Sequence, residues 1–296
     1  MSGRTEPTLA ILGAGPLGAA VARECLARGL SQRIRLHDAD GKAAAALALD
    51  LRGAGGADVE GGNDPAVCAG ADTAVLAMGA DVAALRRWIP LLVKSSPDAV
   101  LLMLSRPVEA LTYAALRLCG LPRSRVIGIG TVLETQLFRR LIARRCKVAV
   151  SDVMAYVAGA QGDAAIPLWS SASIGGILLN TWAVPGHGRL TVRDRAEIFT
   201  AIKATCRQAF EGSWAVAGAA ATVLAAVLGD ANEVWPVSAL FTNMGEVSNV
   251  CLSVPSILNR NGVEDPLAVP MNAAEKAGLA SCAAAVKDSI RALGFE

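Results

Sequence analysis

Histidine is scarce in this sequence: His37 and His187 are the only two among 296 residues. Charged residues make up only 18% of the chain and the net charge is +2, which gives no general attraction to nucleic acid or to an acidic membrane face. The longest apolar run, residues 214–229, is mostly alanine and too short to span a bilayer. We therefore expect neither a nucleic-acid nor a membrane partner.

The sequence also lacks the patterns of disulfide-bonded and secreted proteins. The seven cysteines are odd in number, and no two of them have C-x-x-C spacing, so reduced and buried thiols are expected. The first residues, Met-Ser-Gly-Arg-Thr-Glu-Pro, lack the apolar core of a secretory signal. These features predict a cytoplasmic protein without disulfides.

The remaining composition is that of a folded protein. Hydrophobic residues make up 53% of the chain, which excludes disorder as its overall state. Short apolar runs alternate with helical patterns in the first half. Strands are predicted at residues 8–12, 33–36, 73–78, 99–104 and 125–129, with helices at 17–30, 42–51, 85–94 and 108–119 and a glycine-rich connection at 53–62. This alternation predicts an α/β fold with a doubly wound parallel sheet.

The second half has a different pattern. Helices are predicted at residues 131–145, 192–211, 213–228 and 273–293, with strands near 234–240 and 250–255 and a mixed region at 148–182. Two domains are expected: a Rossmann-type domain at residues 1–130 and an α+β domain at residues 131–296.

A glycine loop follows the first predicted strand. Gly13, Gly15 and Gly18 form the pattern G-x-G-x-x-G at the start of a helix, and Asp38 ends the next strand twenty residues after Gly18. In this context the pattern indicates a site for the pyrophosphate of a dinucleotide, and the carboxylate favours NAD over NADP. The alternative is a glycine loop whose site is not used. His37 is read as a solvated neighbour.

Later motifs resemble the lactate/malate dehydrogenase family. Residues 104–109 (L-S-R-P-V-E) are similar to its strand-end motif, residues 125–133 (R-V-I-G-I-G-T-V-L) match its R-V-I-G-x-G-T-x-L, and residues 159–163 (A-Q-G-D after Gly159) stand where the family has G-x-H-G-D. The resemblance implies hydride transfer between NAD, bound by residues 1–130, and a small 2-hydroxy or 2-keto acid, bound by the substrate domain at residues 131–296. It also adds Gly79 and Ser105 to the cofactor-binding residues.

The sequence departs from the family at the catalytic positions. Gln161 stands at the position of the proton-exchanging histidine, and Glu134 at that of the aspartate which supports it. Leu137 replaces the arginine that grips the substrate carboxylate, and Arg106 replaces an asparagine that touches substrate and cofactor. Only ten residues separate Gly79 from Pro90, too few for the family's mobile loop; the two arginines there, at 86 and 87, read as an exposed helix face.

Two readings of Arg106 remain open. The resemblance places Arg106 and Glu134 at one pocket, so an ion pair between them could fill the substrate space; alternatively, Arg106 could point at the cofactor pyrophosphate or at solvent. His187 lies in a turn beyond the substrate region and is not expected to replace the missing histidine.

The substitutions resemble a degenerate branch of the family, the dehydrogenase-like domain of the ubiquitin-E2-variant fusion protein, which has similar Q-P-V-E and E-Q-G motifs. Residues 213–216 (S-W-A-V) resemble that branch as well. We expect no E2-variant domain before Met1 and no ubiquitin-linked role.

Three functions are compatible with these residues. The first is an NAD-binding pseudoenzyme that senses cofactor or acts as a scaffold, and the second is a divergent oxidoreductase for an uncharged or larger substrate. The third, non-redox catalysis in a reused pocket, has no motif in its favour. The resemblance also implies a homo-oligomer, a dimer or a tetramer.

Overall fold

The first half of the chain forms a parallel sheet. The computed structural model describes residues 6–53, 56–183, 190–212, 214–242 and 247–295. In spatial order the parallel strands are β3 (Asp58–Gly62), β2 (Arg33–His37), β1 (Thr8–Leu12), β4 (Thr73–Leu76), β5 (Val100–Met103) and β6 (Val126–Gly128). This order is that of the doubly wound dinucleotide-binding fold, and it confirms the predicted fold class.

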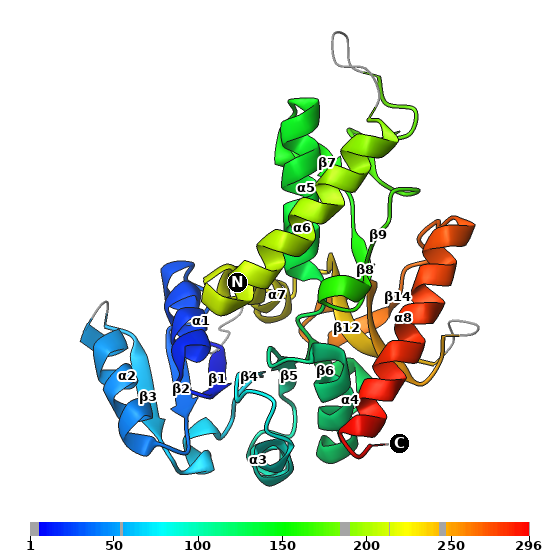
Figure 1. Ribbon diagram of the computed structural model, residues 1–296. Helices are drawn as coiled ribbons and strands as arrows, with labels where there is room; N and C mark the ends of the chain where they lie inside the picture. The colour runs from blue at the N-terminus through cyan, green and yellow to red at the C-terminus, as the bar shows by residue number, and fades with distance from the viewer. Residues whose placement is uncertain (1–5, 54–55, 184–189, 213, 243–246, 296) are drawn as a thin grey trace.

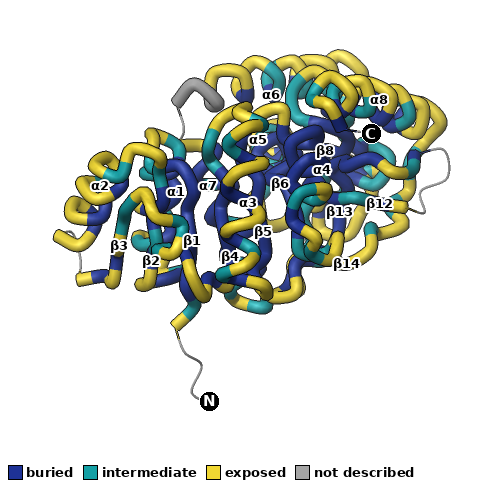
Figure 2. The backbone as a smooth tube through the Cα atoms, turned by 90° about the horizontal axis from the view of Figure 1, so that it is seen from below, coloured by how far each residue is buried: buried dark blue, intermediate teal, exposed yellow. Residues whose placement is uncertain are grey.

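Helices cover both faces of this sheet because its central strands are apolar on both sides. Leu9 and Ile11 of β1 pack with α1 (Pro16–Ala27), α2 (Gly41–Gly53) and α7 (Trp214–Leu228), whereas the alternate residues Ala10 and Leu12 pack with α3 (Val82–Ser95) and α4 (Val108–Cys119). Figure 2 shows the buried strands between helices that expose only their outer sides. A strand buried on both faces is typical of parallel sheets.

The second half extends the same sheet with antiparallel strands. After α5 (Val132–Cys146), the strands β12 (Glu233–Phe241), β13 (Val250–Asn259), β8 (Val157–Gly159) and β9 (Ala165–Pro167) follow β6 in spatial order, and β14 (Gly262–Pro266) pairs with β13. A small second sheet contains β11 (Ile177–Leu178), β10 (Ser173–Ile174) and β7 (Val153–Met154). The remaining elements are α6 (Val192–Gly212), α8 (Ala273–Ala292) and the short 3-10 helices η1 (Pro65–Cys68), η2 (Arg123–Arg125), η3 (Val150–Asp152) and η4 (Gly162–Ala164).

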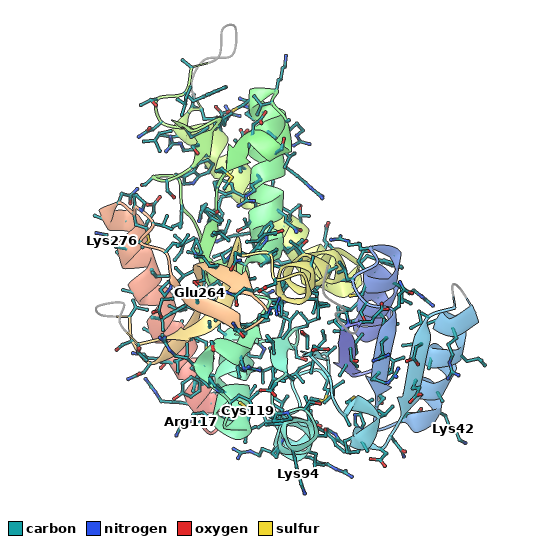
Figure 3. The ribbon with its side chains drawn as sticks, turned by 180° about the vertical axis from the view of Figure 1, so that it is seen from behind. Lys42, Lys94, Arg117, Cys119, Glu264 and Lys276 are labelled. Carbon is teal, nitrogen blue, oxygen red and sulfur yellow. The ribbon has the colours of Figure 1, made fainter. Side chains whose placement is uncertain are left out.

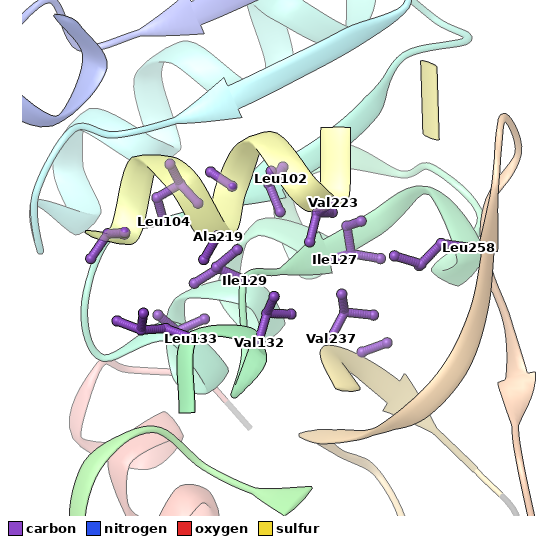
Figure 4. Packing of buried hydrophobic residues seen from close by; sticks show 14 of the residues in the cluster. Leu102, Leu104, Ile127, Ile129, Val132, Leu133, Ala219, Val223, Val237 and Leu258 are labelled. Carbon is purple, nitrogen blue, oxygen red and sulfur yellow. The ribbon is translucent and has the colours of Figure 1, made fainter. Parts of the chain in front are cut away.

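Helix α7 joins the two halves of the molecule. It belongs to the second half in sequence, yet it packs against α1 and β4 of the first half (Figure 1). Figure 4 shows Ala219 and Val223 of α7 beside Leu102 and Ile127 of the parallel sheet. The alanine side chains along α7 are small, so the helix packs close to the sheet. One apolar core therefore runs through both halves.

The sequence prediction missed one parallel strand. Residues 58–62 were expected to belong to a glycine-rich connection, but they form the edge strand β3 beside β2. A Cβ on Gly61 would lie 2.2 Å from the carbonyl oxygen of Ala44 in α2, so glycine at this position allows the helix to cover the strand. In the described ranges, no helix has the length and apolar character that a membrane crossing requires.

Candidate functional site

The glycine loop connects β1 to α1 with the backbone geometry that its pattern predicts. Gly13 has a φ of +107°, and a Cβ there would lie 2.4 Å from the carbonyl oxygen of Ala77. A Cβ on Gly18 would lie 1.9 Å from the carbonyl oxygen of Gly13. Both positions exclude a side chain, because the loop must turn tightly and α1 must begin close to the strand.

Gly15 fits a different requirement. It is the N-cap of α1, it is exposed, and a Cβ built on it would meet no atom within 4 Å. The open space in front of this residue lies at a helix N-terminus whose first turn contains no acidic residue. Free amides and the helix dipole make this place suitable for a pyrophosphate, so the residues present fit a dinucleotide.

Asp38 lies beside the same loop. One of its carboxylate oxygens accepts a hydrogen bond from the Ala14 amide at 2.7 Å, and the other accepts one from the Asp40 amide at 2.9 Å. The end of β2 therefore holds a carboxylate against the glycine loop, where it could accept hydrogen bonds from ribose hydroxyls and repel a 2′-phosphate. Gly79 (φ +71°) and the buried Ser105 lie after β4 and β5 at the same edge of the sheet.

His37 is not the solvated neighbour that the sequence suggested. Its side chain is buried, its ring lies 4.4 Å from that of Trp88 in an edge-on arrangement, and Nε2 is 3.2 Å from the carbonyl oxygen of Asn63. Burial lowers the pKa of His37, which keeps the imidazole neutral. The correction follows from α3, which places Trp88 over the end of β2. His187 lies outside the described residues.

The link between β4 and α3 is short, as expected. β4 ends at Leu76 and α3 begins at Val82, where Asp81 caps the helix through hydrogen bonds from the amides of Ala83 and Ala84. The chain has no room there for a long loop. Arg86 and Arg87 are exposed on α3, as predicted.

Glu134 lies in the first turn of α5, just after β6. Its side chain is buried, and neither carboxylate oxygen has a hydrogen-bond partner among the described residues. Burial raises the pKa of Glu134 to about 7, the charge of Glu109 raises it further, and the nearby Gly162 amide and Arg106 charge offset part of the effect. This carboxyl group can therefore gain or lose a proton near neutral pH.

Sequence reasoning did not assign a role to a second buried carboxyl group, that of Glu109. It lies in the first turn of α4, and one of its oxygens accepts hydrogen bonds from the Gln161 amide at 3.3 Å and from the Ser253 hydroxyl at 3.2 Å. Burial raises its pKa to about 7 as well. Glu109 was visible in the strand-end motif, but its burial depends on β13 and on the residues after β8, which no local signal reveals.

Arg106 does not form the predicted hydrogen-bonded ion pair with Glu134. Both oxygens of Glu134 lack a partner in the described ranges, and Arg106 is exposed, with Nη2 3.7 Å from the position that a Cβ on Gly162 would take. Removing a guanidinium from water is costly, and the exposed position avoids this cost. Arg106 therefore acts on Glu134 through its charge, which lowers the pKa of the carboxyl group, and not through a hydrogen bond.

Gln161 and Leu137 complete the site. The side-chain amide of Gln161 donates to the carbonyl oxygen of Gly130 at 3.0 Å, and its Oε1 is buried without a partner in the described ranges. Leu137 is half-buried in α5 and presents no charge to the site. Arg139, two residues further on, donates to the Ala155 carbonyl oxygen and has aromatic rings of Tyr156 and Trp235 near its guanidinium.

The seven thiols lie inside the protein, and no group of histidine, cysteine and acidic side chains in the described ranges could hold a metal ion. All seven cysteines are buried and free, as predicted. Burial raises the pKa of Cys206, beside Glu134, and also the pKa values of Cys251 and Cys282, beside Glu109. These thiols therefore stay protonated and uncharged at neutral pH.

A separate cavity of about 720 Å³ lies between the C-terminal halves of α4 and α8, lined in part by Tyr113, Arg117, Lys287 and Phe295. Figure 3 shows Arg117 near Cys119, the last residue of α4. Glu109 lies in the first turn of the same helix, so this cavity is distinct from the carboxyl pair.

The sheet order and the glycine loop define a dinucleotide-binding α/β protein with a second, antiparallel half. The chain belongs to the lactate/malate dehydrogenase family: the family's alpha/beta C-terminal domain matches residues 131–294. Residues 8–102 match a domain described as NADP oxidoreductase coenzyme F420-dependent. Together with Asp38, these matches support NAD, the cofactor that the sequence predicts.

Similar proteins cover almost the whole chain. An L-lactate dehydrogenase of Bifidobacterium animalis subsp. lactis is 35% identical over 98% of this chain and 98% of its own length. An L-lactate dehydrogenase of Thermus aquaticus is 33% identical over 96% of this chain and 99% of its own length, and L-lactate dehydrogenase B of Hordeum vulgare is 33% identical over 97% and 91%. The family membership that the motifs predicted is confirmed.

Proposed function

We propose that this chain binds NAD and has lost ordinary activity on 2-hydroxy and 2-keto acids, so that it acts as a cofactor sensor or a scaffold. Gly13, Gly15, Gly18, Asp38, Gly79 and Ser105 would hold the dinucleotide. Two observations together carry the proposal. The glycine loop leaves open space in front of Gly15, whereas the second site has Gln161 and Leu137 where the resemblance implies an imidazole and a guanidinium. Loss of acid–base catalysis alone costs about 10²–10⁴ in rate.

The test combines binding with turnover. NADH fluorescence titration should show binding, while absorbance at the nicotinamide band should show no turnover of pyruvate, oxaloacetate, lactate or malate. The Bifidobacterium L-lactate dehydrogenase, assayed in parallel, is the positive control. Rapid turnover of any of these acids would refute the loss of activity, and failure to bind NADH or NAD would refute the proposal as a whole.

A second candidate function is favoured by the two buried carboxyl groups. Because the pKa values of Glu109 and Glu134 are raised to about 7, these groups could exchange a proton with a substrate at neutral pH in place of histidine. The half-buried Leu137 and the short β4–α3 link would suit an uncharged or larger hydroxy or keto compound. NAD-coupled turnover of a neutral secondary alcohol or ketone, lost in Glu134→Gln, would favour this candidate over the first.

We also propose an oligomeric state, a cellular location and a domain boundary for this protein. We infer a homo-oligomer, a dimer or tetramer, in the cytoplasm, with a domain boundary at residue 130; family membership and the seven buried thiols support these inferences. The likeness to the degenerate branch of the family supports a loss of activity, and no residue supports a ubiquitin-linked role. Light scattering of the purified protein would measure the number of subunits.

A further inference from the structure

The two buried carboxyl groups lie at the ligand-binding edge of the sheet. Glu109 is in the first turn of α4, which follows β5, and Glu134 is in the first turn of α5, which follows β6. Dinucleotides bind across the carboxyl ends of the strands in such sheets, with the pyrophosphate at the first glycine loop. That loop follows β1, so the remainder of the dinucleotide extends toward the ends of β4, β5 and β6.

The contacts show that this pair is poorly compensated. Both oxygens of Glu134 and the Oε1 of Gln161 are buried without a hydrogen bond in the described ranges, although the Gly162 amide and the Cys206 thiol lie near Glu134. Glu109 accepts hydrogen bonds from the Gln161 amide and the Ser253 hydroxyl. Helix N-termini favour the ionised form of a carboxyl group, but burial outweighs this effect at both positions. No lysine or arginine of the described ranges therefore donates a hydrogen bond to Glu134.

In the described ranges, the other ionisable groups near the two carboxyl groups are one exposed arginine and three buried thiols. The charge of Arg106, whose side chain is exposed, lowers the pKa of both carboxyl groups. Cys206 lies near Glu134, and Cys251 and Cys282 lie near Glu109; burial raises the pKa of each thiol, so all three are uncharged at neutral pH.

We propose that Glu109 and Glu134 make the dinucleotide site selective for the oxidised, cationic nicotinamide ring over the neutral reduced ring, and that this selectivity increases as the pair loses its proton. The inference rests on the NAD binding proposed above. It adds a physical basis for sensing: the pair distinguishes two forms of one cofactor that differ by a positive charge on the ring.

The expected linkage has a definite sign. A cation near the pair favours the ionised carboxylates, so NAD⁺ should bind more tightly as pH rises from about 6 to about 8 and should release protons when it binds. NADH carries no charge on its ring, so its affinity should change much less. The two groups titrate as a pair, and the profile reports that pair rather than either residue.

The experiment measures the dissociation constants of NAD⁺ and NADH between pH 5.5 and 8.5 on the full chain. The ratio of the NADH to the NAD⁺ constant should rise by roughly tenfold over this range, the effect of a charge that changes a pKa by about one unit. Calorimetry in two buffers of different ionisation enthalpy should detect proton release with NAD⁺ and little with NADH. This second measurement needs no variant.

Substitutions assign the effect to the pair. Glu134→Gln and Glu109→Gln should each flatten the pH dependence of the ratio, whereas Asp288→Asn, at an exposed carboxylate on α8, should leave it unchanged. A ratio independent of pH, with both nucleotides still bound, would overturn the inference and leave the proposed loss of activity intact. Turnover of hydroxy acids would refute the proposed loss of activity and leave this inference intact.

Discussion

At the scale of single residues, the burial of Glu134 makes the stability of the folded state depend on pH. Its pKa is raised from 4.5 to about 7 by burial. Below pH 4.5 the carboxyl group is protonated in both the folded and the unfolded chain. As pH rises from 4.5 to 7 the unfolded chain ionises first, so the folded state loses stability, by about 3 kcal/mol at 1.36 kcal/mol per pKa unit. Above pH 7 the loss is constant.

Glu134→Gln should therefore gain stability relative to the wild type when pH is raised. Between pH 5 and pH 8 the difference in the free energy of unfolding between variant and wild type should change by about 2–3 kcal/mol in favour of the variant. Urea unfolding at the two pH values measures this change. Asp288→Asn is the matched control on a solvated carboxylate, and an equal difference at both pH values for Glu134→Gln would contradict the account.

Substituting the residues that the resemblance implies at positions 161 and 137 tests the proposed loss of activity. Gln161→His supplies a proton carrier, and Leu137→Arg supplies a partner for a substrate carboxylate. The double variant should reduce pyruvate at least about 10²-fold faster than the wild type in kcat/KM. Leu137→Arg alone supplies no proton carrier and should give no comparable gain, so it is the control. A folded, NADH-binding double variant without any gain would show that other positions block the reaction.

The sequence predicted these residues unequally. Gln161, Glu134 and Leu137 were selected because motifs place them in register with the family, and their roles stay predictions. The burial of Glu109 and the exposure of Arg106 could not be read from the motif, since the two lie three residues apart in the chain and differ only in what the second half of the protein packs against them. The resemblance placed Arg106 and Glu134 at one pocket and so suggested an ion pair, but no hydrogen bond joins them.

At the scale of elements, the β1–α1 loop contains one glycine that the fold requires and another that only nucleotide binding requires. A Cβ on Gly18 would collide with the Gly13 carbonyl oxygen, whereas a Cβ on Gly15 would meet no protein atom. Gly18→Ala should therefore lose NADH binding together with about 1–3 kcal/mol of stability. Gly15→Ala should lose NADH binding with little change in stability, because only the nucleotide uses that space.

Thermal unfolding and NADH titration of the two variants measure both effects. Gly53→Ala, at the end of α2 where a Cβ meets nothing within 4 Å, should change neither. If Gly15→Ala bound NADH as tightly as the wild type, the pyrophosphate would not approach this glycine and the assignment of the loop would fail.

Elements were predicted best where apolar residues repeat. β1 and α4 have the predicted bounds, because each has an unbroken pattern and a clear stop. β3, with the sequence Asp-Val-Glu-Gly-Gly, has one apolar side chain and is an edge strand, so its pattern is that of a loop. Its strand conformation comes from pairing with β2 and from the approach of α2 to Gly61, which are interactions with other parts of the chain.

At the scale of the whole molecule, the parallel and antiparallel halves share one sheet and one core. β6 pairs with β12, Thr131 donates hydrogen bonds to the carbonyl oxygens of Val157 and Pro236, and α7 packs on α1. Glu109 adds a link at the site, from α4 to Ser253 of β13. A structure joined in this way should not open along the predicted domain boundary without exposing apolar core on both sides.

We therefore expect one cooperative unfolding transition for the whole chain. Because α7 covers the parallel sheet while belonging to the second half, neither half can lose its packing alone, and the calorimetric enthalpy should equal the van't Hoff enthalpy. Saturating NADH, which contacts only the folded state, should shift this transition upward as a unit. Two resolved transitions, with only the first responding to NADH, would show instead that the halves are independent domains and that the shared core contributes little to holding them together.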